Sequence, residues 1–236
     1  MSKSILVDTT LCTACRGCQV ACKQWHDLPG EETRNMGSFQ NPQDLSFLTY
    51  KLVRMNEVVL KGKLEWLFFP DQCRHCVEAP CLETAADDST IYSDDATGAI
   101  LYSKETRNLD SDDIIASCPY DIPRASKDGV LAKCDFCNDR IHNGLKPACV
   151  AACPTGAMAF GDRQDILNLA GKRLDKARKR FPDASLLDPD EVNVIYLVAH
   201  SPEAYAHSAV NTRGPFVISR KAALKKMMGP LAGLLT

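Results

Sequence analysis

The stretch Cys12-Thr-Ala-Cys-Arg-Gly-Cys-Gln-Val-Ala-Cys22 decides the fold, because it places four cysteines within a few residues at the spacing C-x2-C-x2-C-x3-C. Bacterial ferredoxins have this spacing. Their first three thiolates bind one 4Fe–4S cluster, and the fourth binds a neighbouring cluster. A second run of this kind elsewhere in the chain is therefore expected to exchange its last ligand with the first run.

The chain contains twelve cysteines, and those outside the first run supply that second run and one further set. They are arranged as Cys73-x2-Cys76-x4-Cys81, Cys118-Pro119 and Cys134-x2-Cys137-x11-Cys149-x3-Cys153-Pro154. Exchange of the last ligands predicts one cluster on Cys12, Cys15, Cys18 and Cys153, a second on Cys134, Cys137, Cys149 and Cys22, and a third on Cys73, Cys76, Cys81 and Cys118. Every cysteine is then used.

None of the positions expected for the ligands of a fourth cluster is a cysteine. In the ferredoxin spacing, a cysteine would follow Cys81 at the position that Ala85 occupies. Counted back from Cys118 with the same spacing, the other positions are Ile114, Ser111 and Asn108. None of these side chains is a good cluster ligand, so the sequence predicts three clusters.

Zinc sites and disulfide frameworks also use many cysteines. Cys-x2-Cys pairs suit zinc, but the four cysteines between residues 12 and 22 crowd a tetrahedral site, and Cys-Pro at the end of a run is typical of ferredoxins. Disulfides stabilise small secreted chains with little core, whereas this chain has 236 residues, of which 45% are hydrophobic. Cluster ligation is therefore favoured over both alternatives.

The overall composition excludes several classes of protein. The formal net charge of −2 gives no indication of nucleic-acid binding, and no apolar run is long enough to span a membrane. Residues 1–8 have no apolar h-region, so we expect no secretion signal and, from this chain alone, a cytoplasmic protein. A cofactor-loaded chain can still cross a membrane folded, bound to a partner with a twin-arginine signal. No acid–base pair, nucleophile triad or phosphate loop stands out, which favours electron transfer over catalysis.

Hydrophobic patterns and turn signals predict an α+β chain. Strands are expected at 4–8, 154–160 and 191–199, with hairpins at 49–60 with 64–69 and at 90–92 with 99–102. Helices are expected at 110–117 and, from apolar residues at helical spacing, at 162–180. Residues 24–46 are polar, contain glycines and prolines, and are expected to form a long loop.

The exchange of cysteines predicts two nested ferredoxin-like units of the bacterial two-cluster type. Residues 1–48 and 127–165 form the outer unit, and residues 49–126 form an inserted unit with one cluster. Residues 166–236 supply a C-terminal helix, a strand and an extended tail. The tail from Thr212 is basic and ends in an apolar segment too short to cross a bilayer, so we expect it to dock on a partner.

Several charged and aromatic residues stand beside the cysteines. Nearby cations stabilise a negatively charged cluster, and the four candidates for this role are Arg16, Lys23, Arg74 and Lys133. The alternative for each of them is a solvated surface charge. His75 is not needed as a ligand, since each set already has four cysteines. We expect Trp25, Trp66 and residues 67–69 to be packing residues that keep water away from the clusters.

Four segments resemble the iron–sulfur (beta) subunits of formate dehydrogenases: residues 12–25, 71–76, 116–121 and 133–137. The resemblance covers about residues 4 to 200 and is greatest to the small subunit of the soluble, tungsten- or molybdenum-containing enzymes of sulfate-reducing bacteria. Members of the wider family commonly hold four cubanes and end in a membrane helix, and this chain departs from both features. The resemblance implies a periplasmic heterodimer, exported with its partner.

The resemblance also implies the partners. A large catalytic subunit with a bis-pterin tungsten or molybdenum centre would oxidise formate, and this chain would pass the electrons to a multihaem c-type cytochrome. The alternatives are an electron-transfer subunit of another molybdopterin oxidoreductase, of the thiosulfate or polysulfide reductase type, and a free-standing polyferredoxin. A zinc-bound interaction module is a further alternative.

Overall fold

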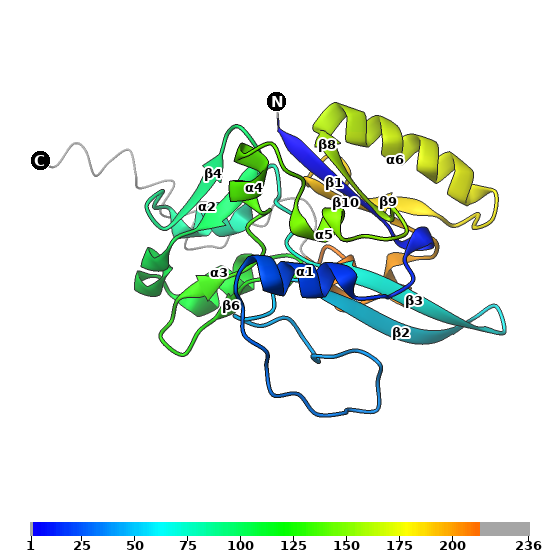
Figure 1. The fold of residues 1–236 in the computed structure, drawn as a ribbon, viewed down its shortest axis with the longest axis horizontal. Helices are drawn as coiled ribbons and strands as arrows, with labels where there is room; N and C mark the ends of the chain where they lie inside the picture. The colour runs from blue at the N-terminus through cyan, green and yellow to red at the C-terminus, as the bar shows by residue number, and fades with distance from the viewer. Residues whose placement is uncertain (1, 213–236) are drawn as a thin grey trace, which may run out of the picture.

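A computed structural model describes residues 2–212 of the chain. Its centre is a four-stranded sheet with the order β8-β1-β10-β9, formed by β1 (Lys3–Asp8), β8 (Met158–Asp162), β9 (Ser185–Leu187) and β10 (Val194–Val198). Strand β1 runs antiparallel to β8 and parallel to β10, so the sheet joins the two ends of the cysteine-rich region (Figure 1).

Burial explains the position of β1 and β10 in the middle of the sheet. All five residues of β10 are buried, as are the last five of β1, which is typical of strands covered on both faces. Helix α6 (Arg163–Arg178) lies along the sheet and contacts β1, β8 and β9 (Figure 1). Its buried residues Ile166, Ala170 and Ala177 recur at helical spacing and face the sheet.

Two short helices carry three of the eight cysteines of the two long runs. Helix α1 (Gly17–Trp25) contains Cys18 and Cys22, while α5 (Ala148–Ala151) contains Cys149. The two helices contact each other, and the 3-10 turn η1 (Thr9–Leu11) and helix α4 (Asn138–His142) flank them. The two cysteine runs are therefore brought together although more than a hundred residues separate them in the chain.

A long hairpin lies against this assembly, formed by β2 (Leu52–Leu60) and β3 (Lys63–Asp71). Its two-residue turn, Lys61-Gly62, has positive φ at both positions (+50° and +78°), as a type I′ turn requires. The turn is one residue shorter than expected, because Lys63 already pairs with Leu60.

The remaining elements of the region between the two cysteine runs form a separate small core. They are α2 (Pro80–Ala85), β4 (Ile91–Asp94), β5 (Ala99–Tyr102), the 3-10 turn η2 (Lys104–Asn108), α3 (Ser111–Ser117), β6 (Arg124–Ala125) and β7 (Leu131–Ala132). Ala85, Ile91, Ile100, Ile114 and Leu131 are buried together in this core. Asp110 caps α3 by accepting hydrogen bonds from the backbone N–H groups of residues 112 and 113.

Most of the predicted elements are confirmed with shifted ends. Both hairpins, both helices and the three strands are present, and residues 26–51 contain no helix or strand. The C-terminal strand β10 starts three residues later than expected and is followed by the 3-10 turns η3 (Pro202–Ala204) and η4 (His207–Ala209). Strands β6, β7 and β9 and helices α1, α2, α4 and α5 were not predicted. The predicted docking tail lies outside the described residues beyond Thr212. No helix within residues 2–212 is long and apolar enough to cross a membrane.

Candidate iron–sulfur sites

Three cavities lie among the cysteine-bearing loops, and four cysteines line each of them. The first cavity has a volume of about 320 Å³. Its wall contains Cys12, Cys15, Cys18 and Cys153, together with Arg16 and Met158. Cys15 is exposed at the surface, whereas Cys18 is buried in α1. These are the four cysteines of the first predicted set.

The second cavity, of about 290 Å³, is lined by Cys22, Cys134, Cys137 and Cys149, all of them buried. The third, of about 340 Å³, is lined by Cys73, Cys76, Cys81 and Cys118. All twelve cysteines are free thiols, so no disulfide competes with these arrangements. The structure thus brings together the members of each predicted set, including the distant ligands Cys22, Cys118 and Cys153.

The same local turn is repeated at each cavity. The backbone N–H of Ala14 points at the Cys12 sulfur (3.5 Å), that of His75 at the Cys73 sulfur (3.3 Å) and that of Phe136 at the Cys134 sulfur (3.4 Å). Each of these three residues has a positive φ, of +53°, +48° and +68° respectively. A left-handed conformation costs a non-glycine residue roughly 1–2 kcal/mol. Its repetition at three cysteines indicates that the N–H···S contact has a function. Amide donors to sulfur are one of the means by which a protein stabilises a reduced cluster.

The chemistry of the donor sets fits 4Fe–4S clusters. Each cavity is lined by four thiols and by no carboxylate; at the second cavity, the imidazole of His26 lines the wall, and the Asp135 carboxylate lies within 4.8 Å of it and of the Cys137 sulfur. Burial raises the pKa of Cys18 to about 11 and that of Cys118 to about 12, so the protein alone disfavours these thiolates. Binding to a metal centre deprotonates such thiols outright.

Three of the four predicted cations line a cavity, and one does not. Arg16 borders the first cavity and binds the carbonyl of Phe39 in the long loop. Lys23, in contrast, donates to the carbonyls of Leu48 (2.7 Å) and Pro29 (3.0 Å), away from all three cavities. Its contacts therefore hold the long loop rather than a cysteine set.

Arg74 and Lys133 both border the third cavity and are almost completely buried. Arg74 lies 4.2 Å over the ring of Tyr196 and pairs with Asp71 at 3.2 Å. Lys133 donates to the carbonyls of Ile100 (2.5 Å) and Cys134 (3.1 Å). The reading of these two residues as solvated surface charges is wrong, since both are buried.

Two polar groups beside the second cavity were not predicted. Lys51 is 2% exposed and lines this cavity, although no cysteine is near it in the sequence. His26 also lines the cavity, and its Nε2 lies 2.9 Å from the carboxylate of Asp135. Burial lowers the pKa of His26, but hydrogen bonds to Asp135 and Cys22 more than offset this and raise it to about 11. The step from Cys22 to His26 spans one helical turn and was a signal that could have found the histidine.

The aromatic residues divide between core and surface. Phe69 and Leu67 are buried as expected, with Phe69 stacked on Tyr196 at 4.4 Å. The prediction of packing roles is wrong for Trp25 and Trp66, which are 42% and 47% exposed. Their indoles lie on the outside because α1 and the β2–β3 hairpin turn these faces away from the sheet.

His75 is fully buried between the third and second cavities. Its Nδ1 accepts a hydrogen bond from the backbone N–H of Ile100 (3.0 Å), and its ring lies 4.6 Å from that of Phe136. Burial and the charge of Lys133 hold the pKa of His75 well below its ordinary value. The imidazole is therefore neutral and is absent from the wall of every cysteine-lined cavity.

The positions of the blank fourth site are occupied by the small core of α2 and α3. Ala85 and Ile114 are 3% and 1% exposed and belong to one apolar cluster. Asn108 is exposed and bonds to the carboxylate of Glu105 instead. None of the three cysteine-lined cavities reaches these residues or Ser111.

Comparison with known proteins agrees with this geometry. Residues 64–163 match a family described as a 4Fe-4S dicluster domain. The chain is 55% identical to a formate dehydrogenase subunit beta from Megalodesulfovibrio gigas, over 89% of this chain and all of that protein. It belongs to the iron–sulfur subunits of formate dehydrogenases.

Two further relatives show how widely this family extends. The formate dehydrogenase 2 subunit beta (cytochrome c-553) of Nitratidesulfovibrio vulgaris is 50% identical, over 87% of this chain and 97% of that protein. The iron–sulfur subunit of a nitrate-inducible formate dehydrogenase from Escherichia coli is 37% identical, over 85% of this chain and 70% of that protein. This formate dehydrogenase subunit is accordingly a non-catalytic, electron-transferring member of an enzyme complex.

Proposed function

We propose that this subunit holds three 4Fe–4S clusters and conducts electrons from a formate-oxidising catalytic subunit to a c-type cytochrome. The observation that carries the proposal is the grouping of twelve cysteines around three cavities, four to each. Each cluster, when bound, accepts and releases one electron at a time. The apolar core at Ala85 and Ile114 supports the absence of a fourth cluster.

The contacts among the cysteines support a linear order with the Cys22 set in the middle. Cys18 of the first set and Cys149 of the second lie close enough to affect each other's charge, as do Cys134 of the second set and Cys73 of the third. Among the cysteines, Cys12 interacts most with Cys15 and Cys153 of its own set, and Cys118 with Cys81 and Cys73 of its own set. The first and third cavities are therefore the ends of the electron path.

The nested arrangement of two ferredoxin-like units is part of this proposal. Pairing of β1 with β8 supports the outer unit, since these strands lead into the first cysteine run and out of the last one. The hairpin β4–β5 and the packing of α2 on α3 support an inserted unit that carries only the third cavity.

The surfaces at the two ends differ, and we assign them to different partners. The elements that carry the first cysteine run and the segments beside them expose several large apolar side chains: Leu11, Val20, Met36, Phe39 and Trp66. Arg16 on the cavity wall binds Phe39, whose ring lies 5.2 Å from that of Trp66, so this surface is continuous with the cavity. A permanent interface is richer in such residues, which fits the catalytic subunit with its bis-pterin tungsten or molybdenum centre.

The segments that flank α2 and the first turn of α3, on the side of the third cavity, expose several carboxylates beside a few other side chains: Glu78, Asp87, Asp88, Asp110 and Asp112. Such a surface attracts a basic redox protein and speeds its encounter, which fits a multihaem c-type cytochrome as acceptor. Thr212 bonds to the carbonyl of Pro119, directly after Cys118, so the basic tail starts at this same end of the subunit. We assign the tail to the docking of a partner.

We place the complex in the periplasm, exported with a catalytic subunit that carries a twin-arginine signal. The cytochrome c-553 in the name of the Nitratidesulfovibrio vulgaris relative supports a cytochrome as the acceptor. Cell fractionation tests the compartment. Activity confined to the cytoplasmic fraction would contradict it.

Native purification under anaerobic conditions, with metal analysis and identification of the co-purifying chain, tests the proposal as a whole. Three clusters of four irons give about twelve irons per subunit, beyond those of the partner. A monomer that shuttles electrons freely would favour the polyferredoxin alternative, and a partner active on thiosulfate or polysulfide would favour the other molybdopterin enzymes. Zinc in place of iron would refute cluster binding.

A further inference from the structure

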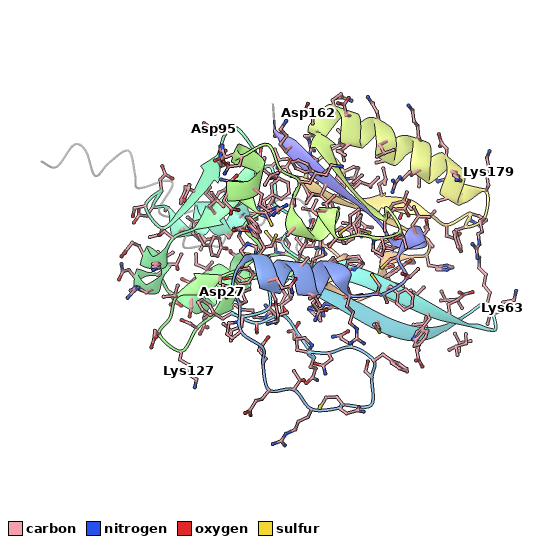
Figure 2. The ribbon with its side chains drawn as sticks, in the orientation of Figure 1. Asp27, Lys63, Asp95, Lys127, Asp162 and Lys179 are labelled. Atoms are coloured by element: carbon pink, nitrogen blue, oxygen red, sulfur yellow. The ribbon has the colours of Figure 1, made fainter. Side chains whose placement is uncertain are left out.

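Most lysines among residues 2–212 are exposed or partly exposed, and two are buried. Figure 2 shows the side chains of Lys63, Lys127 and Lys179 at the rim of the molecule, directed outwards. Lys51 and Lys133 are instead 2% and 6% exposed. Burial of an ammonium group is costly unless negative charge compensates it, so each buried lysine needs an electrostatic partner.

Lys51 has no carboxylate partner among the residues that the structure describes. Its Nζ donates to the side-chain carbonyl of Gln72 and lies 3.5 Å from the carbonyl of Pro70, and both acceptors are neutral. The other deeply buried cations of the core, Arg54 and Arg74, share the carboxylate of Asp71. Lys51 therefore lacks the compensation that its buried neighbours have.

Cysteine sets lie on two sides of Lys51, and the anionic clusters that they would hold are the missing negative charge. Lys51 lines the second cavity together with Cys149, and its charge also acts on Cys18 and Cys12 of the first cavity. The carbonyl of Pro70, 3.5 Å from the Lys51 Nζ, belongs to a residue that lines the first cavity. The ammonium thus lies at the junction between the first and second cysteine sets.

Lys133 occupies the equivalent position at the next junction. It lines the third cavity, immediately precedes Cys134 of the second, and its charge acts on Cys81. The Lys133 ammonium also donates its hydrogen bonds to neutral carbonyls. The carboxylate of Asp135 is bonded to His26 and affects Lys133 only at longer range. One buried ammonium therefore stands at each step between neighbouring cavities.

We infer that Lys51 is a fixed positive charge that raises the reduction potentials of the clusters on both sides of it, and that Lys133 does the same for the second and third clusters. Reduction adds negative charge to a cluster that is already anionic, so a desolvated ammonium nearby favours the reduced form. A charge placed between two clusters also offsets the repulsion between them when both are reduced. The inference rests on the proposed cluster binding.

The test is an EPR-monitored redox titration of the intact complex with Lys51→Met, which removes the charge and keeps the length of the side chain. The reduced-to-oxidised ratio of two of the three centres is expected to fall about tenfold at a fixed potential, a shift of about 59 mV for a one-electron couple. Lys133→Met is expected to lower the reduction potentials of the second and third centres. Only the middle centre should therefore respond to both substitutions. Lys51→Arg keeps the charge and should restore the potentials.

Lys61→Met is the matched control, because Lys61 lies at the tip of the β2–β3 hairpin with its side chain 82% exposed. It should leave all three potentials unchanged. If Lys51→Met fails to assemble, Lys51→Gln removes the charge while keeping a polar group, and the same shift is expected. Unshifted potentials in a neutral variant with its full iron content would overturn the inference and leave cluster binding intact. Wild-type protein without about twelve irons would instead refute the proposed function itself.

Discussion

The carboxylate of Asp71 and the guanidinium of Arg74 lie 3.2 Å apart, and both side chains are almost completely buried. The same carboxylate binds Arg54 at 2.6 Å and accepts a hydrogen bond from Ser208 at 2.7 Å. Arg74 continues the network to the carbonyl of Ser208, at 2.7 Å. One buried carboxylate at the end of β3 thus ties together the hairpin, the third cavity and the segment after β10.

Loss of this carboxylate is expected to be strongly destabilising. Asp71→Asn leaves two buried guanidinium groups without their shared counterion, which costs roughly 3–5 kcal/mol of the free energy of unfolding. Thermal or urea unfolding of the complex measures the effect. The control is Asp183→Asn, which removes the exposed ion pair between Lys61 and Asp183 and should cost only about 0–1 kcal/mol. Equal losses of the free energy of unfolding in the two variants would show that the buried network stabilises the fold no more than the exposed ion pair does.

The sequence predicted more of the cysteine arrangement than of its surroundings. Cys22 and Cys153 were each assigned to the cluster of the other run, more than a hundred residues away. The ferredoxin spacing allows this, because the last cysteine of each run ligates the neighbouring cluster. Lys51 was missed, because the residue just before β2 reaches the second cavity through the tertiary fold and not through any neighbouring motif. Lys23 shows the reverse error: adjacency to Cys22 in the chain did not place its ammonium at the cavity.

The sequence pattern also did not predict the left-handed backbone conformation at three positions. Ala14, His75 and Phe136 share one left-handed turn, yet none of the three is a residue type that usually adopts it. The turn is imposed by the need to direct an N–H at a cysteine sulfur, which tertiary geometry decides. Strand β9 was overlooked for a similar reason, since its three residues pair only because β10 offers an edge.

Substitution of Ile114 tests whether the region of the missing fourth cluster is part of the hydrophobic core. It is 1% exposed and packs with Ala85, Ile91 and Ile100, so Ile114→Ala should lower the free energy of unfolding by roughly 2–5 kcal/mol through the cavity it leaves. The iron content should remain about twelve per subunit, because no cluster depends on this residue. Chemical denaturation and iron analysis on the same samples measure both quantities. A loss of about four irons would mean that a cluster does occupy this region.

Removal of iron should weaken the whole fold rather than one loop. Helix α1 carries Cys18 of the first cavity and Cys22 of the second, and α5 carries Cys149 of the second, so the bound clusters would cross-link these helices. Ligands that bind only the folded state stabilise it by mass action, and apoprotein also keeps Lys51 buried without its compensating charge. Circular dichroism should show a lower melting temperature after chelation, with recovery on anaerobic reconstitution with iron and sulfide. An unchanged melting temperature would contradict this expectation.

Cys118 gives the most selective test of the ligand sets. It lies far along the chain from Cys81, yet both line the third cavity, and Cys118→Ala removes one of the four sulfurs there. The third cluster should be lost or degraded to a three-iron form, because three cysteines cannot hold a complete cubane. The first and second cavities contain none of the atoms that are changed, so two centres should keep their EPR signals. Electron delivery to the cytochrome should fall, whereas formate oxidation with an artificial acceptor at the catalytic subunit should continue.

Cys15→Ala is the matched control for this variant, since it removes one sulfur from the first cavity at the opposite end of the electron path. It should alter a different signal and leave the third centre intact. Complementary losses in the two variants would establish that the sets are independent. Loss of all three signals in Cys118→Ala would mean that the fold has collapsed, and loss of none would show that Cys118 is not a ligand of the third cluster.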